Sequence, residues 1–151
     1  VLPLMESFLS IQGEGYFAGK SSYFLRIGGC DVGCHWCDVK ESWDADVHPP
    51  THIGQIVENA TKYSKTIVIT GGEPLTWDMT ELTGNLKKKG CDIHIETSGA
   101  YDLTGTWDWI CLSPKKPCEL KQTQIKSIFL MRQRRLPRGL GICEDPPSST
   151  S

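Results

Sequence analysis

The chain has 151 residues, seven cysteines and a formal net charge of −2. Residues 1–118 carry 10 Lys and Arg against 15 Asp and Glu. This acidic balance gives no electrostatic reason to expect direct binding of nucleic acid. Its length fits one domain, and no apolar stretch approaches the roughly 18 residues of a membrane span. The N-terminal residues lack the features of a secretory signal, and the odd, clustered cysteines argue against a disulfide framework, so we expect a cytoplasmic protein without a membrane segment.

Strand-like and helix-like segments alternate along the chain. In chain order, strands are expected over residues 22–27, 66–70, 91–97 and 109–112, and helices over residues 51–63 and 78–89. The apolar positions of the helices recur on one face, with Ile53, Ile56, Val57, Ala60 and Tyr63 in the first and Met79, Leu82 and Leu86 in the second, and Gly90 ends the second. Alternating strands and helices predict an α/β fold with a parallel sheet and right-handed crossovers.

Three cysteines follow the first strand at C-x3-C-x2-C spacing: Cys30, Cys34 and Cys37. Three thiolates in one short loop can bind three irons of a cubane iron–sulfur cluster, which leaves the fourth iron open to an outside ligand. The alternatives are a Cys3His zinc site with His35 as the fourth ligand, or ordinary buried thiols. We favour the open cluster, because His35 lies too close in sequence to its cysteine neighbours to complete a relaxed tetrahedron.

Each expected strand runs directly into a polar or glycine-rich segment. The first meets the cysteine loop, and the others meet Gly-Gly-Glu-Pro at residues 71–74, Glu-Thr-Ser-Gly at residues 96–99 and Ser-Pro-Lys at residues 113–115. In β/α barrels the carboxyl ends of the strands open onto one face, where the active site lies. We therefore expect these four segments on one rim.

These segments resemble those of the radical S-adenosylmethionine (SAM) enzymes and, more narrowly, of the 7-carboxy-7-deazaguanine synthase family of the queuosine pathway. The resemblance rests on residues 10–15 (Ser-Ile-Gln-Gly-Glu-Gly), 24–27, 28–38, 70–74, 95–99 and 112–116. It implies an incomplete β/α barrel of the radical SAM type over residues 1–118, with a parallel sheet and cut short at the C-terminus. Residues 119–151 would form an atypical tail without family likeness.

The resemblance also implies a reaction. Cys30, Cys34 and Cys37 would hold a [4Fe–4S] cluster whose open iron is chelated by SAM, and no catalytic side chain is expected beyond the cofactor ligands. Reductive cleavage of SAM would generate the 5′-deoxyadenosyl radical, which takes a hydrogen from 6-carboxy-5,6,7,8-tetrahydropterin. Ring contraction and loss of ammonia then give 7-carboxy-7-deazaguanine, which makes the enzyme a lyase. Its expected partners are an electron donor such as flavodoxin or ferredoxin and a second copy in a homodimer.

Further residues would hold the two small molecules. The residues implied to bind SAM are Trp36, Cys37, Asp38, Gly72, Glu73, Ser113, Pro114 and Lys115. The residues implied to bind the pterin are Ile11, Gln12, Gly13, Arg26 and Thr70, with the Arg26 guanidinium paired with the substrate carboxylate. The family usually has a threonine after Cys-Asp that helps to bind Mg2+. Val39 stands there and offers no side-chain oxygen, so we expect Mg2+ to depend on substrate and water oxygens instead.

Two other functions fit part of the sequence. A radical SAM activase that installs a glycyl radical on a partner protein shares the cysteine loop, but would not be expected to combine Gln-Gly-Glu-Gly with Ser-Pro-Lys. A truncated, non-catalytic remnant that binds an iron–sulfur cluster or zinc fits the atypical tail. Outside these motifs, Cys91 and Cys111 are expected to be buried small side chains and His94 to be structural.

Overall fold

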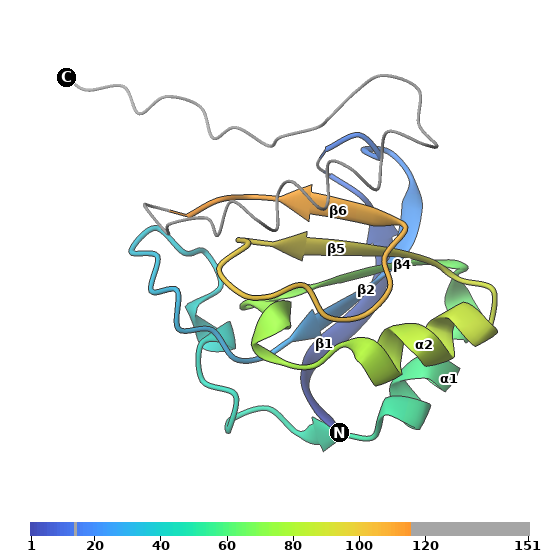
Figure 1. Cartoon of the computed structure of the whole chain (residues 1–151), viewed down its shortest axis with the longest axis horizontal. Helices are drawn as coiled ribbons and strands as arrows, with labels where there is room; N and C mark the ends of the chain where they lie inside the picture. The colour runs from blue at the N-terminus through green and yellow to red at the C-terminus, as the bar shows by residue number, and fades with distance from the viewer. Residues whose placement is uncertain (14, 116–151) are drawn as a thin grey trace.

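The computed structural model describes residues 1–13 and 15–115 (Figure 1). Six strands form one sheet in the order β3-β1-β2-β4-β5-β6. The strands are β1 Leu2–Ile11, β2 Ser21–Ile27, β3 Pro50–Thr51, β4 Thr66–Gly71, β5 Asp92–Thr97 and β6 Trp109–Leu112, and the α-helices are α1 Ile53–Tyr63 and α2 Thr80–Lys88. The predicted tail over residues 119–151 lies outside the described residues.

The four predicted strands are confirmed, and they pair in parallel as β2-β4-β5-β6. Strand β1 was not predicted. It pairs antiparallel with β2 and with β3, so the sheet is mixed rather than wholly parallel. Its register with β2 shifts between Leu4 and Glu6, and such a bulge breaks the alternation of inward and outward side chains by which a strand is recognised in a sequence.

Helices α1 and α2 lie together on one face of the sheet (Figure 1), where alternate strand residues form the hydrophobic core. That core includes Leu25, Ile67, Ile69, Ile93 and Ile95 from the strands and Ile53, Ile56, Val57, Ala60, Leu82 and Leu86 from the helices, with Met79 just before α2. The expected burial of Tyr63 is wrong, since it is 62% exposed in the last turn of α1 and stacks on Tyr23.

The opposite face of the parallel strands carries a different set of side chains. Because side chains alternate along a strand, Arg26 of β2, Thr70 of β4 and Glu96 of β5 face away from the helices, where they line a cavity. Within the described part of the chain, no helix is long and apolar enough to cross a membrane.

Candidate active site

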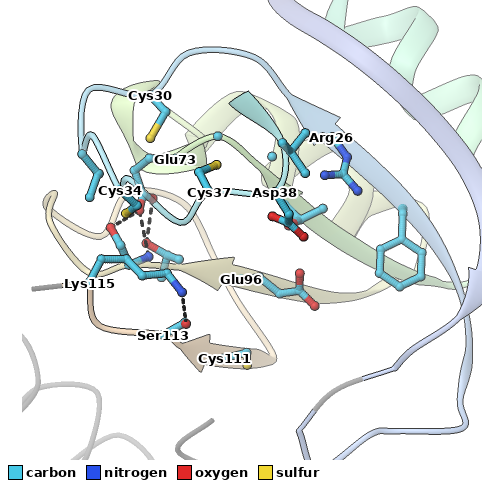
Figure 2. A pocket seen from close by; sticks show the side chains of 18 of the residues that line it. Arg26, Cys30, Cys34, Cys37, Asp38, Glu73, Glu96, Cys111, Ser113 and Lys115 are labelled. Carbon is cyan, nitrogen blue, oxygen red and sulfur yellow. Dashed lines mark hydrogen bonds between the residues drawn. The ribbon is translucent and has the colours of Figure 1, made fainter. Parts of the chain in front are cut away.

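A cavity of about 450 Å³ is lined by the ends of the parallel strands and the cysteine loop (Figure 2). It brings together segments from four strand ends, as their common position at one edge of a parallel sheet predicts. The predicted site residues that line it are Ile11, Gln12, Gly13, Arg26, Cys30, Cys34, Trp36, Cys37, Asp38, Thr70, Gly72, Glu73, Ser113 and Lys115. Pro114 is exposed and is not part of the lining.

The thiols of Cys30, Cys34 and Cys37 lie toward one end of the cavity (Figure 2). All five described cysteines are thiols rather than disulfides, and nowhere in residues 1–13 or 15–115 do three His, Cys, Asp or Glu side chains converge on a point where one metal ion could bind. A zinc ion needs such convergence, at about 2.3 Å from each sulfur. In a cubane cluster each cysteine binds a different iron, so three thiols of one loop can bind that group without converging on a single ion.

His35 does not behave as a fourth metal ligand. Its side chain is exposed, outside the cavity lining, and packs edge-on against Trp36 with ring centroids 4.4 Å apart. Burial raises the pKa of the Cys30 thiol, so a metal that binds there must displace its proton. Within this loop, Cys30, Cys34 and Cys37 line the cavity, whereas His35 does not.

The cysteine loop crosses directly over the turn that follows β4, and two glycines make this approach possible. A Cβ atom on Gly71 would lie 2.0 Å from the Ile27 carbonyl oxygen, and one on Gly72 would lie 2.8 Å from the Cβ of Cys30. The Gly72 N–H donates to the Ile27 carbonyl at 3.0 Å, and the Glu73 N–H donates to the Gly29 carbonyl at 2.9 Å. A side chain at Gly71 would clash with the backbone at the end of β2, and one at Gly72 would clash with the start of the cysteine loop, so both close approaches require glycine.

The loop is also attached on a second side. The Tyr101 hydroxyl donates a hydrogen bond to Asp31, the residue after Cys30. This bond raises the pKa of Tyr101 to about 12, because the phenol proton is held between the two side chains. The first half of the cysteine loop is thus fixed both to the turn after β4 and to the segment after β5.

Glu73 lines the cavity, but its carboxylate is hydrogen-bonded to other residues of the chain. Only 1% of the residue is exposed. Oε1 accepts hydrogen bonds from the Leu75 N–H at 3.1 Å and the Thr97 hydroxyl at 2.7 Å, and Oε2 accepts from the Ser98 N–H at 2.8 Å and from the Ser98 hydroxyl. Four donors use the four acceptor sites of a carboxylate, so Glu73 ties the end of β4 to the end of β5.

The end of the cavity away from the thiols carries Arg26 and Glu96, with Asp38 beside them (Figure 2). Nε of Arg26 lies 2.7 Å from a carboxylate oxygen of Glu6, which stands opposite it on β1, but its N–H bond is directed elsewhere, so the contact is an ion pair without a hydrogen bond. Glu96 accepts a hydrogen bond from the Gln12 side chain at 2.8 Å. This end can therefore recognise a polar molecule that carries both an anionic group and hydrogen-bond donors.

Sequence reasoning assigned no role to Glu6 or Glu96. The alternation along β5 could have placed Glu96. His94 and Glu96 alternate with the buried Ile93 and Ile95, so both point away from the core between the sheet and the helices. Glu6 has no such signal, because β1 itself was not recognised.

The end of β6 completes the rim. The Ser113 N–H donates to the Thr97 carbonyl at 2.9 Å, and the Lys115 ammonium donates to the Ser113 hydroxyl at 2.6 Å. Val39 lines the cavity beside Asp38 and contributes only an apolar side chain. The rim thus presents one cation next to a hydroxyl and no side-chain oxygen at position 39.

Comparison with known proteins agrees with this arrangement. The sequence model of the radical SAM superfamily matches residues 25–115. The chain is 72% identical over 116 residues to 7-carboxy-7-deazaguanine synthase of Flavobacterium psychrophilum, which covers 77% of this chain and 55% of that protein. It is 34% identical to the protein of the same name from Buchnera aphidicola, which covers 87% of this chain and 73% of that protein.

The fold leads to the same group. A crystal structure of QueE from Escherichia coli matches with a TM-score of 0.65 at 26% identity, covering 90% of this chain and 78% of that one. The chain spans between a half and two thirds of the length of most of these curated relatives, at 55% for the protein from F. psychrophilum and 59% for one from Synechocystis.

Proposed function

Since the chain belongs to the radical SAM superfamily and, within it, to the 7-carboxy-7-deazaguanine synthase family, we propose that it converts 6-carboxy-5,6,7,8-tetrahydropterin to 7-carboxy-7-deazaguanine with loss of ammonia, in queuosine biosynthesis. The observation that carries this proposal is one cavity with three thiols toward one end and the Arg26 and Glu96 side chains toward the other. The first end suits the cofactor and the second suits a polar, carboxylate-bearing substrate.

Cys30, Cys34 and Cys37 would hold a [4Fe–4S] cluster, and when bound it supplies the electron that cleaves SAM and so starts the radical reaction. Gly72 would approach the methionine part of SAM through its backbone, because it has no side chain to block the contact. Trp36, Asp38, Ser113 and Lys115 would line the rest of the SAM site. Glu73 supports this site rather than contacting SAM with its carboxylate, since all four acceptor positions already have donors in the chain.

The substrate would lie at the other end. The Arg26 guanidinium is suited to binding a carboxylate. Its ion pair with Glu6 is made through Nε, the nitrogen nearest the aliphatic part of the side chain. Glu96 can accept hydrogen bonds from the amino and ring N–H groups of a pterin, and the Ile11, Gln12, Gly13 and Thr70 positions would add contacts from β1 and β4. Enclosure by these residues would exclude water from the reacting ring.

Other features of the function are proposed on family likeness alone. Mg2+ would be coordinated by the substrate carboxylate and by water, because the Val39 side chain offers no oxygen ligand. Flavodoxin or ferredoxin would deliver the electron, and the chain would act as a cytoplasmic homodimer.

Turnover is the direct test. The full chain is loaded with iron and sulfide without oxygen, then given SAM, a reductant and carboxytetrahydropterin, and the products are followed by mass. We expect 7-carboxy-7-deazaguanine and ammonia in equal amounts. A chain that binds cluster, SAM and pterin but forms no product would instead fit the non-catalytic remnant.

A further inference from the structure

The far end of the N-terminal hairpin, which joins β1 to β2, curls across to the last strands of the sheet (Figure 1). Tyr16 stacks on Trp109 of β6 with ring centroids 5.4 Å apart and 27° between the planes. Phe17 packs edge-on against Trp109 with ring centroids 4.8 Å apart, and its ring is tilted by 37° to that of His94 of β5 at a centroid distance of 4.6 Å. We call these four residues the hairpin aromatic cluster.

Charged groups fix the same contact. The Lys20 ammonium donates to an Asp92 carboxylate oxygen at 2.8 Å and lies 5.1 Å from the centre of the Phe17 ring. The same Asp92 oxygen lies 3.3 Å from Nε2 of His94, which is only 3% exposed. Burial lowers the pKa of His94, so at neutral pH an uncharged ring faces Phe17. The hairpin end is thus attached to β5 and β6 by both apolar and ionic contacts.

This attachment reaches the cavity through Gln12. The Gln12 N–H donates to the Lys20 carbonyl at 2.9 Å, and the Gln12 carbonyl accepts from the Gly19 N–H at 2.8 Å. Gln12 is 7% exposed, and its side-chain amide donates to Glu96 at 2.8 Å. Its backbone is therefore held by the segment that carries Phe17 and Lys20, and its side chain meets the substrate end of the cavity.

We propose that the hairpin aromatic cluster is a positioning element, in which Phe17 holds Gln12 against Glu96 and so sets the shape of the substrate end of the cavity. Phe17 is not among the residues that line the cavity. Its effect on the substrate is therefore indirect. The proposed substrate selectivity rests on the proposed function, whereas the mechanical link from Phe17 to Gln12 does not.

The rival explanation is that the hairpin aromatic cluster only packs the hairpin against β5 and β6 and so has a purely structural role. In that case loss of the Phe17 ring lowers the stability of the whole domain and affects the SAM and pterin ends alike. A positioning role predicts a selective effect instead, since no residue of the cluster lies in the cysteine loop or in the turn after β4, and the described contacts lead from the cluster to Gln12 and Glu96.

The first measurement is amide hydrogen exchange on the full, cluster-loaded chain. In Phe17→Ala we expect faster exchange at Gln12 and Gly19, while the amides of β4 exchange as in the wild type. Tyr63→Ala, which removes an exposed aromatic ring stacked on Tyr23, serves as the matched control and should leave Gln12 and Gly19 unchanged. Unaltered exchange at these two amides in Phe17→Ala would overturn the proposal, whether or not the chain acts on a pterin.

The second measurement is affinity on the same loaded samples. We expect Phe17→Ala to bind carboxytetrahydropterin about tenfold more weakly, the loss of roughly one well-placed hydrogen bond, with SAM affinity within about twofold. Phe17→Tyr keeps the ring and should restore pterin affinity. If Phe17→Ala does not fold, Phe17→Leu carries the same comparison. Equal weakening of SAM and pterin would contradict positioning, whereas a wild-type chain that binds no pterin would overturn the proposed function and leave the exchange result to decide the link.

Discussion

Glu73→Gln is the substitution whose outcome follows most directly from the geometry. A glutamine of the same shape keeps one oxygen, which can still accept from Leu75 and Thr97, but its amide nitrogen faces the Ser98 N–H. One buried donor then loses its acceptor, at a cost of about 1–3 kcal/mol, and the remaining bonds lose the strength that a charged acceptor gives them. We therefore expect the free energy of unfolding to fall by about 2–4 kcal/mol.

The assay is urea unfolding of the full chain without cluster, under reducing conditions, with the midpoint and slope compared between variants. Glu58→Gln on the exposed face of α1 is the matched control, since its ion pair with Lys62 spans 3.8 Å at the surface and is worth less than about 0.5 kcal/mol. Thr97→Val removes one donor to Glu73 and also the acceptor of the Gly99 N–H, and should cost about 1–3 kcal/mol. The reasoning is refuted if Glu73→Gln unfolds like the wild type while the loaded protein loses most of its SAM affinity, because Glu73 would then be a SAM ligand.

Four further outcomes are expected. Cys34→Ala should abolish binding of about four irons per chain in anaerobic loading, measured by iron and sulfide content, whereas Cys91→Ala, buried outside the cavity lining, should retain them. Arg26→Ala should weaken pterin binding by about 2–4 kcal/mol with SAM affinity nearly unchanged, and equal loss of both ligands in calorimetry would make Arg26 structural. Val39→Thr should introduce or sharpen a dependence of turnover on Mg2+, and a tight Mg2+ requirement already present with Val39 would place the metal elsewhere. The hydrogen bond to Asp31 raises the pKa of Tyr101 to about 12. This bond therefore stabilises the fold below the ordinary tyrosine pKa of about 10, and that stabilisation is lost as the pH rises toward 12. Asp31→Asn should bring the pKa of Tyr101, measured by ultraviolet titration, back toward about 10.

The parallel part of the fold could be predicted because its signals are local. Buried strands such as β4 are short runs of Ile, Val and Thr, and α1 and α2 repeat their apolar residues at helical spacing. Strand β1 could not be predicted, because its bulge breaks the alternation of inward and outward side chains. Its polar and apolar residues fit neither the two-residue period of a strand nor the 3.6-residue period of a helix. Its antiparallel pairing with β2 depends on the long connection between them, which carries no tight hairpin signal.

The candidate site divides in the same way. The rim could be predicted from connectivity, because residues that end parallel strands meet at one edge of the sheet. The contacts that shape the cavity join residues far apart in the sequence, such as Gln12 with Glu96 and Glu73 with Ser98. These contacts depend on the antiparallel pairing of β1 with β2 and on the close approach of the cysteine loop to the turn after β4, and no local sequence pattern predicts either.

The measurement that tests the central claim most directly is the paramagnetic resonance of the reduced, cluster-loaded chain with and without SAM. If the three thiols hold an open cluster, one electron should give a cubane signal that SAM changes on binding the fourth iron. Each of Cys30→Ala, Cys34→Ala and Cys37→Ala should remove that signal. A signal that SAM leaves unchanged, or tight zinc that persists under anaerobic iron loading, would contradict the account.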